Sequence, residues 1–282
     1  MRILIYDNQN KDPEGDHAGL LKRLLEERGA ETVTFVSGYA SASDPGDVMS
    51  LAEGCDAIFT LGGDGTVLQA ARQTKTLNVP IAGVNLGKVG YLTEIELDSL
   101  EEYIDRYFRG DYYVETRMML NGQVKFSDGR DAEAWALNDV VVSRSGSLQI
   151  RDLDIYVNGL LLTRYHSDGV IITTPTGSTG YNLSAGGPIV EPGAALLTMT
   201  PICPHTLNQR SIILRPEDEI VIQIPEARGE SQELEASFDG VSVTTLKSGD
   251  RIRVTKSEKK TYFIRFDRTS FLEILRKKLG EN

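Results

Sequence analysis

The chain has 282 residues, of which 40% are hydrophobic and 25% are charged, and this length and balance predict a globular protein with two domains. Its 30 Lys and Arg residues against 41 Asp and Glu residues leave a net charge of −11, which argues against a broad nucleic-acid face and against docking on an anionic membrane. No segment resembles a membrane span or a signal peptide, and the two distant cysteines indicate neither a disulfide framework nor a metal site, so we expect a cytoplasmic protein.

In the first part of the chain, short apolar runs alternate with segments of helical periodicity. Strands are expected at residues 2–6, 32–37, 57–61 and 79–84. Helices are expected at 18–25, 48–52, 67–71 and, after these strands, 98–109, with a polar loop at 41–46. Such alternation predicts parallel strands with crossover helices, and therefore an α/β domain with a Rossmann-like sheet over residues 1–98.

Beyond residue 109 the pattern changes to alternating apolar residues between turn dipeptides, which predicts antiparallel strands. Hairpin turns are expected at Asn121-Gly122, Asn158-Gly159 and Asp239-Gly240. Further strands are expected at 212–214, 219–224, 234–238, 251–255 and 262–266. Residues 99–268 are therefore expected to form a β-rich domain.

The last fourteen residues return to helical periodicity. Ser270 and Glu273 have the spacing of a capping box. An apolar stripe follows on one helical face, formed by Phe271, Ile274, Leu275 and Leu279. Because such a stripe has to be buried, this helix (269–282) is expected to cover another part of the protein.

A glycine-rich hexad, Leu61-Gly62-Gly63-Asp64-Gly65-Thr66, stands where an apolar strand ends and a helical segment begins. Glycines allow close approach of the backbone to a ligand, and amide groups at a helix N-terminus attract an anion. A carboxylate in such a turn makes sense if Asp64 accepts a proton from an attacking hydroxyl or reaches a metal ion. The alternative, in which Asp64 only caps the helix, stays open on the hexad alone.

A second segment, residues 168–188 (DGVIITTPTGSTGYNLSAGGP), is rich in hydroxyl groups and glycines. It offers hydrogen-bonding groups at close backbone approach and an aromatic face for a nucleobase. The polar side chains in question are those of Thr176, Ser178, Thr179, Tyr181, Asn182 and Ser184.

These segments, together with LND, PICPHTL and FDG, resemble bacterial NAD kinases over nearly the whole chain. The GGDGT motif also occurs in lipid kinases related to diacylglycerol kinase and, in variant form, in phosphofructokinases, whereas TPTGST-Y-S-GGP is specific to this family. The resemblance implies an N-terminal α/β domain, a β-rich, sandwich-like C-terminal domain, and a final helix that packs back on the first domain.

The resemblance also implies a reaction, the transfer of a phosphoryl group from ATP or polyphosphate to the 2′-hydroxyl of the adenosine ribose of NAD, which gives NADP. A divalent metal ion, magnesium, would assist. Asp64 falls on the family's essential carboxylate and would act as the general base. The implied phosphate cradle consists of Gly62, Gly63, Gly65 and Thr66. Family members are commonly homo-oligomers, so a dimer or tetramer is expected.

Further binding residues follow from the same resemblance. Asn138 and Asp139 match a pair that grips the adenosine, although Asp139 is one methylene shorter than the usual Glu. Gly180 replaces a usual Ala, which should widen the adenine pocket slightly. The remaining positions are Thr179 and Tyr181 at the adenine, Ser184 and Asp168 at the other end of the dinucleotide, Tyr91 and Leu92 on an apolar wall, and Asp239 near the dinucleotide. From spacing alone, Asn138-Asp139 and Asp239-Gly240 indicate turns, and the histidines His166 and His205 indicate structural roles.

Two other functions stay open at this point. A lipid kinase would share the glycine-rich turn, but the acidic composition and the absence of a membrane-docking segment in the sequence argue against it. A non-catalytic dinucleotide-binding regulator would keep the fold without turnover, and the presence of Asp64 argues against that function.

Overall fold

The computed structural model describes residues 1–38, 45–88, 90–144, 151–205, 209–226, 233–267 and 270–280. The backbone divides into two compact units, one of Met1–Arg117 with Lys260–Asn282 and the other of Met118–Lys259. Two long strands, β6 (Tyr113–Lys125) and β17 (Arg251–Arg265), run from one unit into the other. Among the described helices, none is long and apolar enough to cross a membrane.

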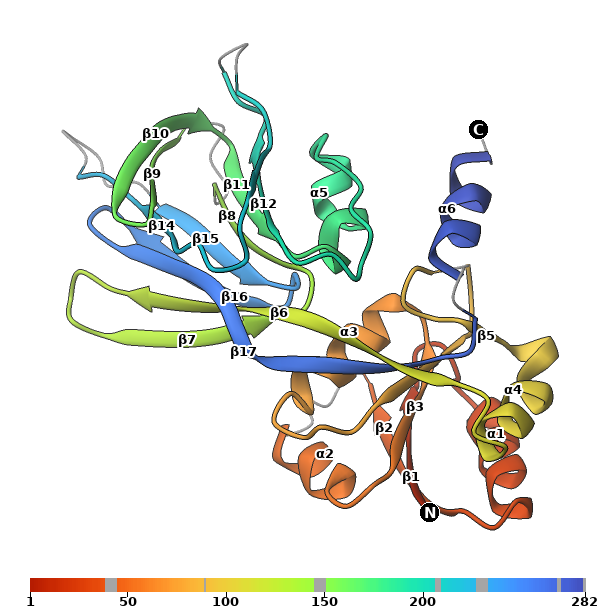
Figure 1. Cartoon of the computed structure of the whole chain (residues 1–282). Helices are drawn as coiled ribbons and strands as arrows, with labels where there is room; N and C mark the ends of the chain where they lie inside the picture. Colours follow the sequence, from red (N-terminus) through yellow and green to blue (C-terminus); the bar gives the residue numbers. More distant parts are fainter. Residues whose placement is uncertain are drawn as a thin grey trace. The chain divides into compact units, whose positions relative to one another are not determined.

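The first unit is built on a parallel sheet with the strand order β2-β1-β3-β4 (Figure 1). The end of β17 lies parallel to β4, through the pair Phe263 and Ile81. The strands are β1 (Arg2–Asn8), β2 (Glu31–Ser37), β3 (Ala57–Gly62), β4 (Ile81–Asn85) and the short β5 (Ile95–Glu96). The helices are α1 (Asp16–Glu27), α2 (Pro45–Ala52), α3 (Asp64–Gln73), η1 (Leu97–Ser99), α4 (Leu100–Phe108) and α6 (Ser270–Gly280). The α/β prediction for this region is confirmed.

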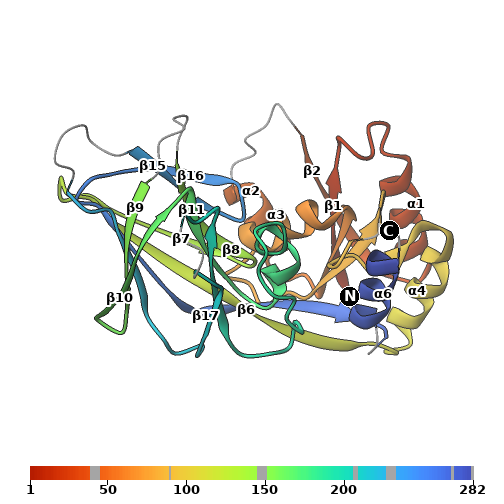
Figure 2. The same ribbon diagram turned by 90° about the horizontal axis from the view of Figure 1, so that it is seen from above.

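One face of this sheet is covered by α1 and α4, which lie side by side in Figure 1 and Figure 2. Ile3 and Ile5 of β1 are fully buried in one cluster with Leu25 of α1 and Ile104 of α4. Because neighbouring residues of a strand point to opposite faces, this apolar alternation fixes which face the two helices cover. Parallel strands place their carboxyl ends at one edge, so β1, β3 and β4 end together there.

The second unit is a two-layer β-sandwich. One layer is an antiparallel sheet with the order β13-β12-β11-β8-β15-β16. The other contains the antiparallel strands β10-β9-β14 and the first part of β17, and also the pair β6 and β7. One buried apolar cluster draws on both layers, with Val142 of β8 and Ile172 of β11 beside Ile155 of β9 and Ile222 of β14. The sandwich-like fold implied by the resemblance is thereby confirmed.

The elements of the second unit follow the chain in short strands. They are β7 (Asp131–Ala136), β8 (Asp139–Arg144), β9 (Arg151–Val157), β10 (Leu160–Ser167), β11 (Gly169–Thr173), η2 (Thr176–Thr179), α5 (Tyr181–Ser184), β12 (Leu197–Ile202), β13 (Ile212–Leu214), β14 (Ile220–Gln223), β15 (Glu233–Phe238) and β16 (Ser242–Lys247). The hairpins predicted at Asn158-Gly159 and Asp239-Gly240 are confirmed, and all four residues have positive φ.

The hairpin predicted at Asn121-Gly122 is wrong. Strand β6 runs straight through these two residues and pairs them with Trp135 and Ala134 of β7. A Cβ on Gly122 would lie 2.3 Å from the ring of Phe238, so the glycine makes room for an aromatic side chain and does not form a turn. The chain reverses direction between β6 and β7, at the Ser127–Arg130 turn, where Gly129 has φ +88.

Two other expectations differ from the structure or lie outside it. The strands expected at 251–255 and 262–266 are parts of the single strand β17. Of the polar loop at 41–46, residues 41–44 lie outside the described residues, as do 206 and 207 at the end of PICPHTL. The final helix packs on the first unit as expected, with Ile274 buried and the ring of Phe271 6.3 Å from that of Tyr91.

Candidate functional site

The glycine-rich turn joins β3 to α3, and Gly63 occupies the N-cap position of the helix. A Cβ on Gly62 would lie 2.2 Å from Oγ1 of Thr66, so only glycine permits this close approach. Thr66 is buried, and its hydroxyl oxygen accepts a hydrogen bond of 2.8 Å from Nδ2 of Asn8. Thr66 therefore fastens the turn to the end of β1, while Gly65 is exposed.

Asp64 is half-buried in the first turn of α3, and its carboxylate does not cap that helix. Oδ2 accepts the backbone N–H of Tyr91 at 2.8 Å, and Oδ1 accepts those of Leu92 and Thr93 at 2.9 and 3.3 Å. Successive amide groups of this kind form a cradle for an anionic group. The alternative that Asp64 only caps the helix is therefore wrong. Instead, the backbone of residues 91–93 holds its carboxylate in a fixed direction.

The segment around Gly90 encloses this carboxylate closely. A Cβ on Gly90 would lie 1.9 Å from Oδ1 of Asp64 and 2.8 Å from Oγ1 of Thr93. Tyr91 packs against the final helix, where the ammonium of Lys278 lies 5.2 Å from the ring centroid of Tyr91. Burial, together with the nearby negative charge of Asp64, raises the pKa of Tyr91. The side chain of Leu92 is core, because it is 3% exposed.

In the second unit, the Asn138-Asp139 pair is held by Asp239. The carboxylate of Asp239 accepts the backbone N–H groups of Leu137, Asn138 and Asp139 at 2.8, 2.7 and 3.1 Å. Asp239 has φ +52 in the hairpin between β15 and β16, a conformation that Asp tolerates better than most residues. Asp239 therefore forms part of the predicted hairpin turn and also fixes the backbone at the start of β8.

The side chain of Asp139 is buried, whereas Asn138 is partly buried. Burial, with a smaller contribution from the negative charge of Asp239, raises the pKa of Asp139 to about 7. Oδ1 of Asn138 is buried and has no hydrogen-bond partner among the described residues. A buried polar atom without a partner is uncommon, and a bound ligand or water molecule would satisfy it.

The hydroxyl-rich segment wraps around the backbone of the same pair. The carbonyl oxygen of Asn138 accepts both the hydroxyl of Thr173 and the backbone N–H of Thr174 at 2.9 Å. A Cβ on Gly180 would lie 3.4 Å from Nδ2 of Asn138 and 3.9 Å from Oδ2 of Asp139. The two positions at which the chain departs from the family pattern, Asp139 and Gly180, are therefore neighbours.

Three of the six polar residues expected to offer ligand contacts in this segment, Thr176, Ser178 and Asn182, are buried, which the sequence did not predict. Oγ of Ser178 bonds to the backbone of Val190, and Asn182 is fully buried, donating to the carbonyl groups of Ser178 and Pro188. These groups stabilise the loop and do not face a ligand. Outward polar groups belong to the exposed Tyr181 and Ser184 and to the half-buried Thr179.

Asp168 lies between β10 and β11, where its carboxylate forms an ion pair of 3.0 Å with Nε of Arg144. His166, for which a structural role was expected, pairs with Asp152 through Nδ1. Sequence reasoning missed Asn8, Thr173 and Thr174 as supports of the two motifs. Only Asn8 had a usable signal, since it is a polar residue that ends the first parallel strand.

The predicted residues thus form two groups, each within one unit. Gly62, Gly63, Asp64, Gly65, Thr66 and Tyr91 lie together in the first. Asn138, Asp139, Gly180 and Asp239 lie together in the second. Thr179, Tyr181 and Ser184 belong to η2 and α5, which contact β11, and Asp168 directly precedes β11. Among the described residues, no group of three or more His, Cys, Asp or Glu side chains is placed to hold a metal ion.

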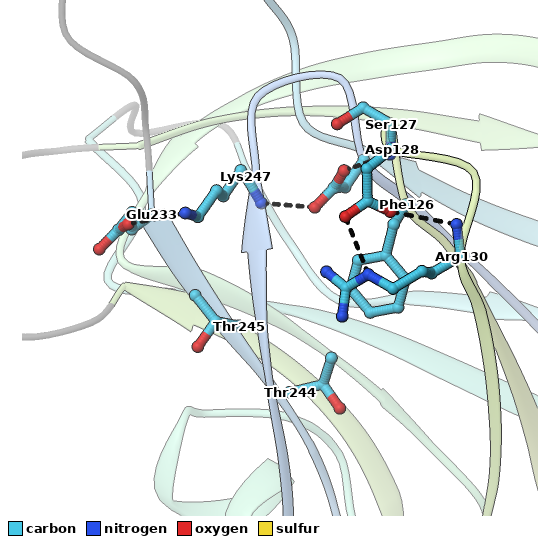
Figure 3. Close-up of a pocket in the computed structure, with 9 residues that line it drawn as sticks. Phe126, Ser127, Asp128, Arg130, Glu233, Thr244, Thr245 and Lys247 are labelled. Atoms are coloured by element: carbon cyan, nitrogen blue, oxygen red, sulfur yellow. Dashed lines mark hydrogen bonds and ion pairs between the residues drawn. The ribbon is translucent and has the colours of Figure 1, made fainter.

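A cavity of about 650 Å³ in the second unit contains none of the predicted residues (Figure 3). Its charged groups pair with one another: Arg130 with Asp128, and Lys247 with Glu233. The buried Asp250 accepts the backbone N–H groups of Ser127 and Lys247, both at 2.7 Å. The charged groups of the cavity therefore stabilise the neighbouring hairpins through these pairings.

The chain is similar to proteins of known activity. Models of the ATP-NAD kinase N-terminal domain and of the ATP-NAD kinase C-terminal domain match residues 45–112 and 137–266. Proteins named NAD kinase from Lachnospira eligens and Thermoanaerobacter sp. are 42% and 44% identical, over 98% and 99% of both chains. A solved NAD kinase from Archaeoglobus fulgidus in complex with ATP covers all of both chains, with a TM-score of 0.80 and 25% identity. Yeast NADH kinase complexed with NADH has the same fold, with a TM-score of 0.83 over 100% of this chain and 88% of that one, at 24% identity. The chain therefore belongs to the NAD kinase family.

Proposed function

We infer that the chain is an NAD kinase that phosphorylates NAD with ATP, and that Asp64 is the general base of the reaction. In this proposal the attacking group is the 2′-hydroxyl of the adenosine ribose, and the product is NADP. The observation that carries the assignment is the carboxylate of Asp64, which three backbone N–H groups hold at the N-terminus of α3.

The chemistry needs few groups. As the hydroxyl oxygen bonds to the γ-phosphorus, the bond from that phosphorus to the bridging oxygen of the donor breaks, and ADP leaves. The hydroxyl proton passes to Asp64. Phosphoryl transfer depends mainly on alignment and on stabilising charge, and the amide groups of the Gly62–Thr66 turn are suited to phosphate oxygens.

The second unit supplies the proposed contacts to the dinucleotide. Asn138 and Asp139 are assigned to the adenosine, because the buried, unpartnered Oδ1 of Asn138 is an acceptor suited to an N–H or O–H group of a ligand. Below its raised pKa, Asp139 carries a proton and can donate a hydrogen bond to a ligand. The remaining assignments are Thr179, Gly180 and Tyr181 at the adenine, and Ser184 and Asp168 at the other end of the dinucleotide. Asp239 is reassigned as a support of Asn138 and Asp139.

The metal and the assembly are also proposals. The described residues form no cluster of His, Cys, Asp or Glu that could hold a metal ion, and magnesium would arrive on the triphosphate. ATP is the proposed donor, with polyphosphate as an alternative. A cytoplasmic location and a homo-oligomer, dimer or tetramer, stay predictions.

Product formation tests the proposal directly. Purified protein is incubated with magnesium and with each pairing of NAD or NADH and ATP, another triphosphate or polyphosphate, and NADP or NADPH is measured. We expect NADP from NAD and ATP. NAD binding without NADP from any donor would support a regulator instead, and phosphorylation of diacylglycerol in a parallel reaction would support the lipid kinase.

A further inference from the structure

We propose that Arg265 is a positioning residue for Asp64, acting through the peptide group between Leu92 and Thr93 and supported by Glu94. The inference rests on the proposed function, because it assigns a role in catalysis to a residue that would not touch a substrate. All of the residues concerned belong to the first unit.

Arg265 and Asp64 bind opposite ends of one peptide group. Nη1 of Arg265 donates to the carbonyl oxygen of Leu92 at 3.1 Å, and the N–H of Thr93, the other end of the same planar group, donates to Oδ1 of Asp64 at 3.3 Å. The cation fixes the orientation of the peptide plane and polarises it, which strengthens the N–H as a donor. A peptide rotated out of this plane would remove a donor from the carboxylate of Asp64.

Glu94 ties the same segment to the end of β17. Its carboxylate accepts the backbone N–H groups of Phe266 and Asp267 at 3.3 and 3.1 Å, and it lies 3.7 Å from Nη1 of Arg265. The Arg265 and Glu94 side chains are 4% and 6% exposed, so the pair is shielded from solvent. Burial raises the pKa of Glu94, and the charge of Arg265 opposes that effect.

The guanidinium is itself fixed by a second carboxylate. Nε of Arg265 lies 3.1 Å from Oε2 of Glu115, and the cation lies 5.1 Å from the ring centroid of Phe263. A planar group held at Nε leaves Nη1 directed at Leu92 and Glu94. A lysine has one ammonium and no fixed plane, so it can neutralise the two glutamates but cannot fix the Leu92 carbonyl in the same way.

The test compares the wild type with Arg265→Lys and Arg265→Gln. We expect kcat to fall by about tenfold or more in Arg265→Gln and by less in Arg265→Lys, while KM for NAD and for ATP changes by less than about threefold, because orientation of the base is altered and binding is not. Backbone hydrogen exchange, followed by mass spectrometry, should be faster at residues 91–93 in both variants.

A matched control separates positioning from lost stability. Leu25→Ala removes a fully buried side chain of α1, which packs in the same unit in a hydrophobic cluster that contains none of residues 90–94, and should cost about 2 to 5 kcal/mol. We expect its kcat and its exchange at 91–93 to match the wild type at a temperature where it is folded. An equal fall of kcat in Leu25→Ala and Arg265→Gln, or a change in KM alone, would overturn the inference.

Each remaining outcome also decides the inference. If Arg265→Gln does not fold, Arg265→Lys decides, and wild-type kcat with wild-type exchange at 91–93 would overturn the inference. If the wild type forms no NADP, the proposed function fails. Faster exchange at 91–93 would then still support the structural link between Arg265 and this segment, so the two failures can be told apart.

Discussion

Asp239 accepts the backbone N–H of Asn138 at 2.7 Å, the shortest of three hydrogen bonds by which its carboxylate holds residues 137–139. Asp64 is held in the reverse sense in the other unit, since its carboxylate is fixed by the backbone of Tyr91, Leu92 and Thr93. In one case a carboxylate positions a binding segment, and in the other a backbone segment positions a carboxylate. The two arrangements give different predictions.

Asp239→Asn should weaken NAD binding without altering the reacting groups. An amide has one acceptor oxygen in place of two, so at least one of the three backbone N–H groups loses its partner, and hydrogen bonds to charged groups contribute roughly 1.5 to 3 kcal/mol. We expect the dissociation constant for NAD, measured by calorimetry, to rise about tenfold. Asp250→Asn is the control, because Asp250 holds two backbone N–H groups at another hairpin. A similar loss of NAD affinity in both variants would mean that the effect is general destabilisation.

Gly90→Ala should displace the carboxylate of Asp64. The added methyl would lie 1.9 Å from Oδ1, far inside van der Waals contact, and the short Asp side chain is held by three hydrogen bonds. We expect kcat to fall on the order of a hundredfold. Gly87→Ala, in the same segment, places its methyl with no atom within 4 Å and should keep wild-type kcat. Equal activity of the two variants would contradict the described packing around Asp64.

Asp139 should make stability depend on pH. Its pKa is raised to about 7 by burial, so the folded state holds a proton that the unfolded chain releases near pH 4. The stabilisation from this group is therefore complete below pH 4 and is lost as the pH rises through 7. Asp139→Asn does not titrate, so its free energy of unfolding relative to the wild type should increase by roughly 2 kcal/mol from pH 5 to pH 8. Urea unfolding at the two pH values measures this, and a constant difference would show that Asp139 does not titrate in that range.

Local signals in the sequence predicted much of the fold. The parallel and antiparallel regions follow from the two hydrophobic periods, and Asn158-Gly159 forms a hairpin because both residues adopt the positive φ that its turn requires. The same dipeptide at Asn121-Gly122 lies in mid-strand, because Gly122 makes room for Phe238, more than a hundred residues away. A rule that considers only neighbouring residues in the sequence cannot predict this contact.

The candidate site shows the same limit. Sequence patterns and family resemblance selected Asp64, Asn138 and Asp139, but not the groups that orient them. Which backbone N–H groups meet Asp64 depends on how residues 90–93 fold, and Asn182 is buried because its amide joins Ser178 to Pro188. Composition alone favoured a ligand contact for Asn182. Only its hydrogen bonds in the folded protein show that Asn182 stabilises the loop.

The central claim is that Asp64 takes the proton of the attacking hydroxyl, and turnover of Asp64→Asn tests it most directly. NADP formation and NAD affinity are measured for the wild type, for Asp64→Asn and for Asp98→Asn, which removes one exposed carboxylate in the same unit. We predict that Asp64→Asn lowers kcat by a factor on the order of a hundred or more while folding and NAD affinity stay close to wild type, with Asp98→Asn unchanged in all three. Wild-type turnover in a folded Asp64→Asn protein would contradict the assignment of the base.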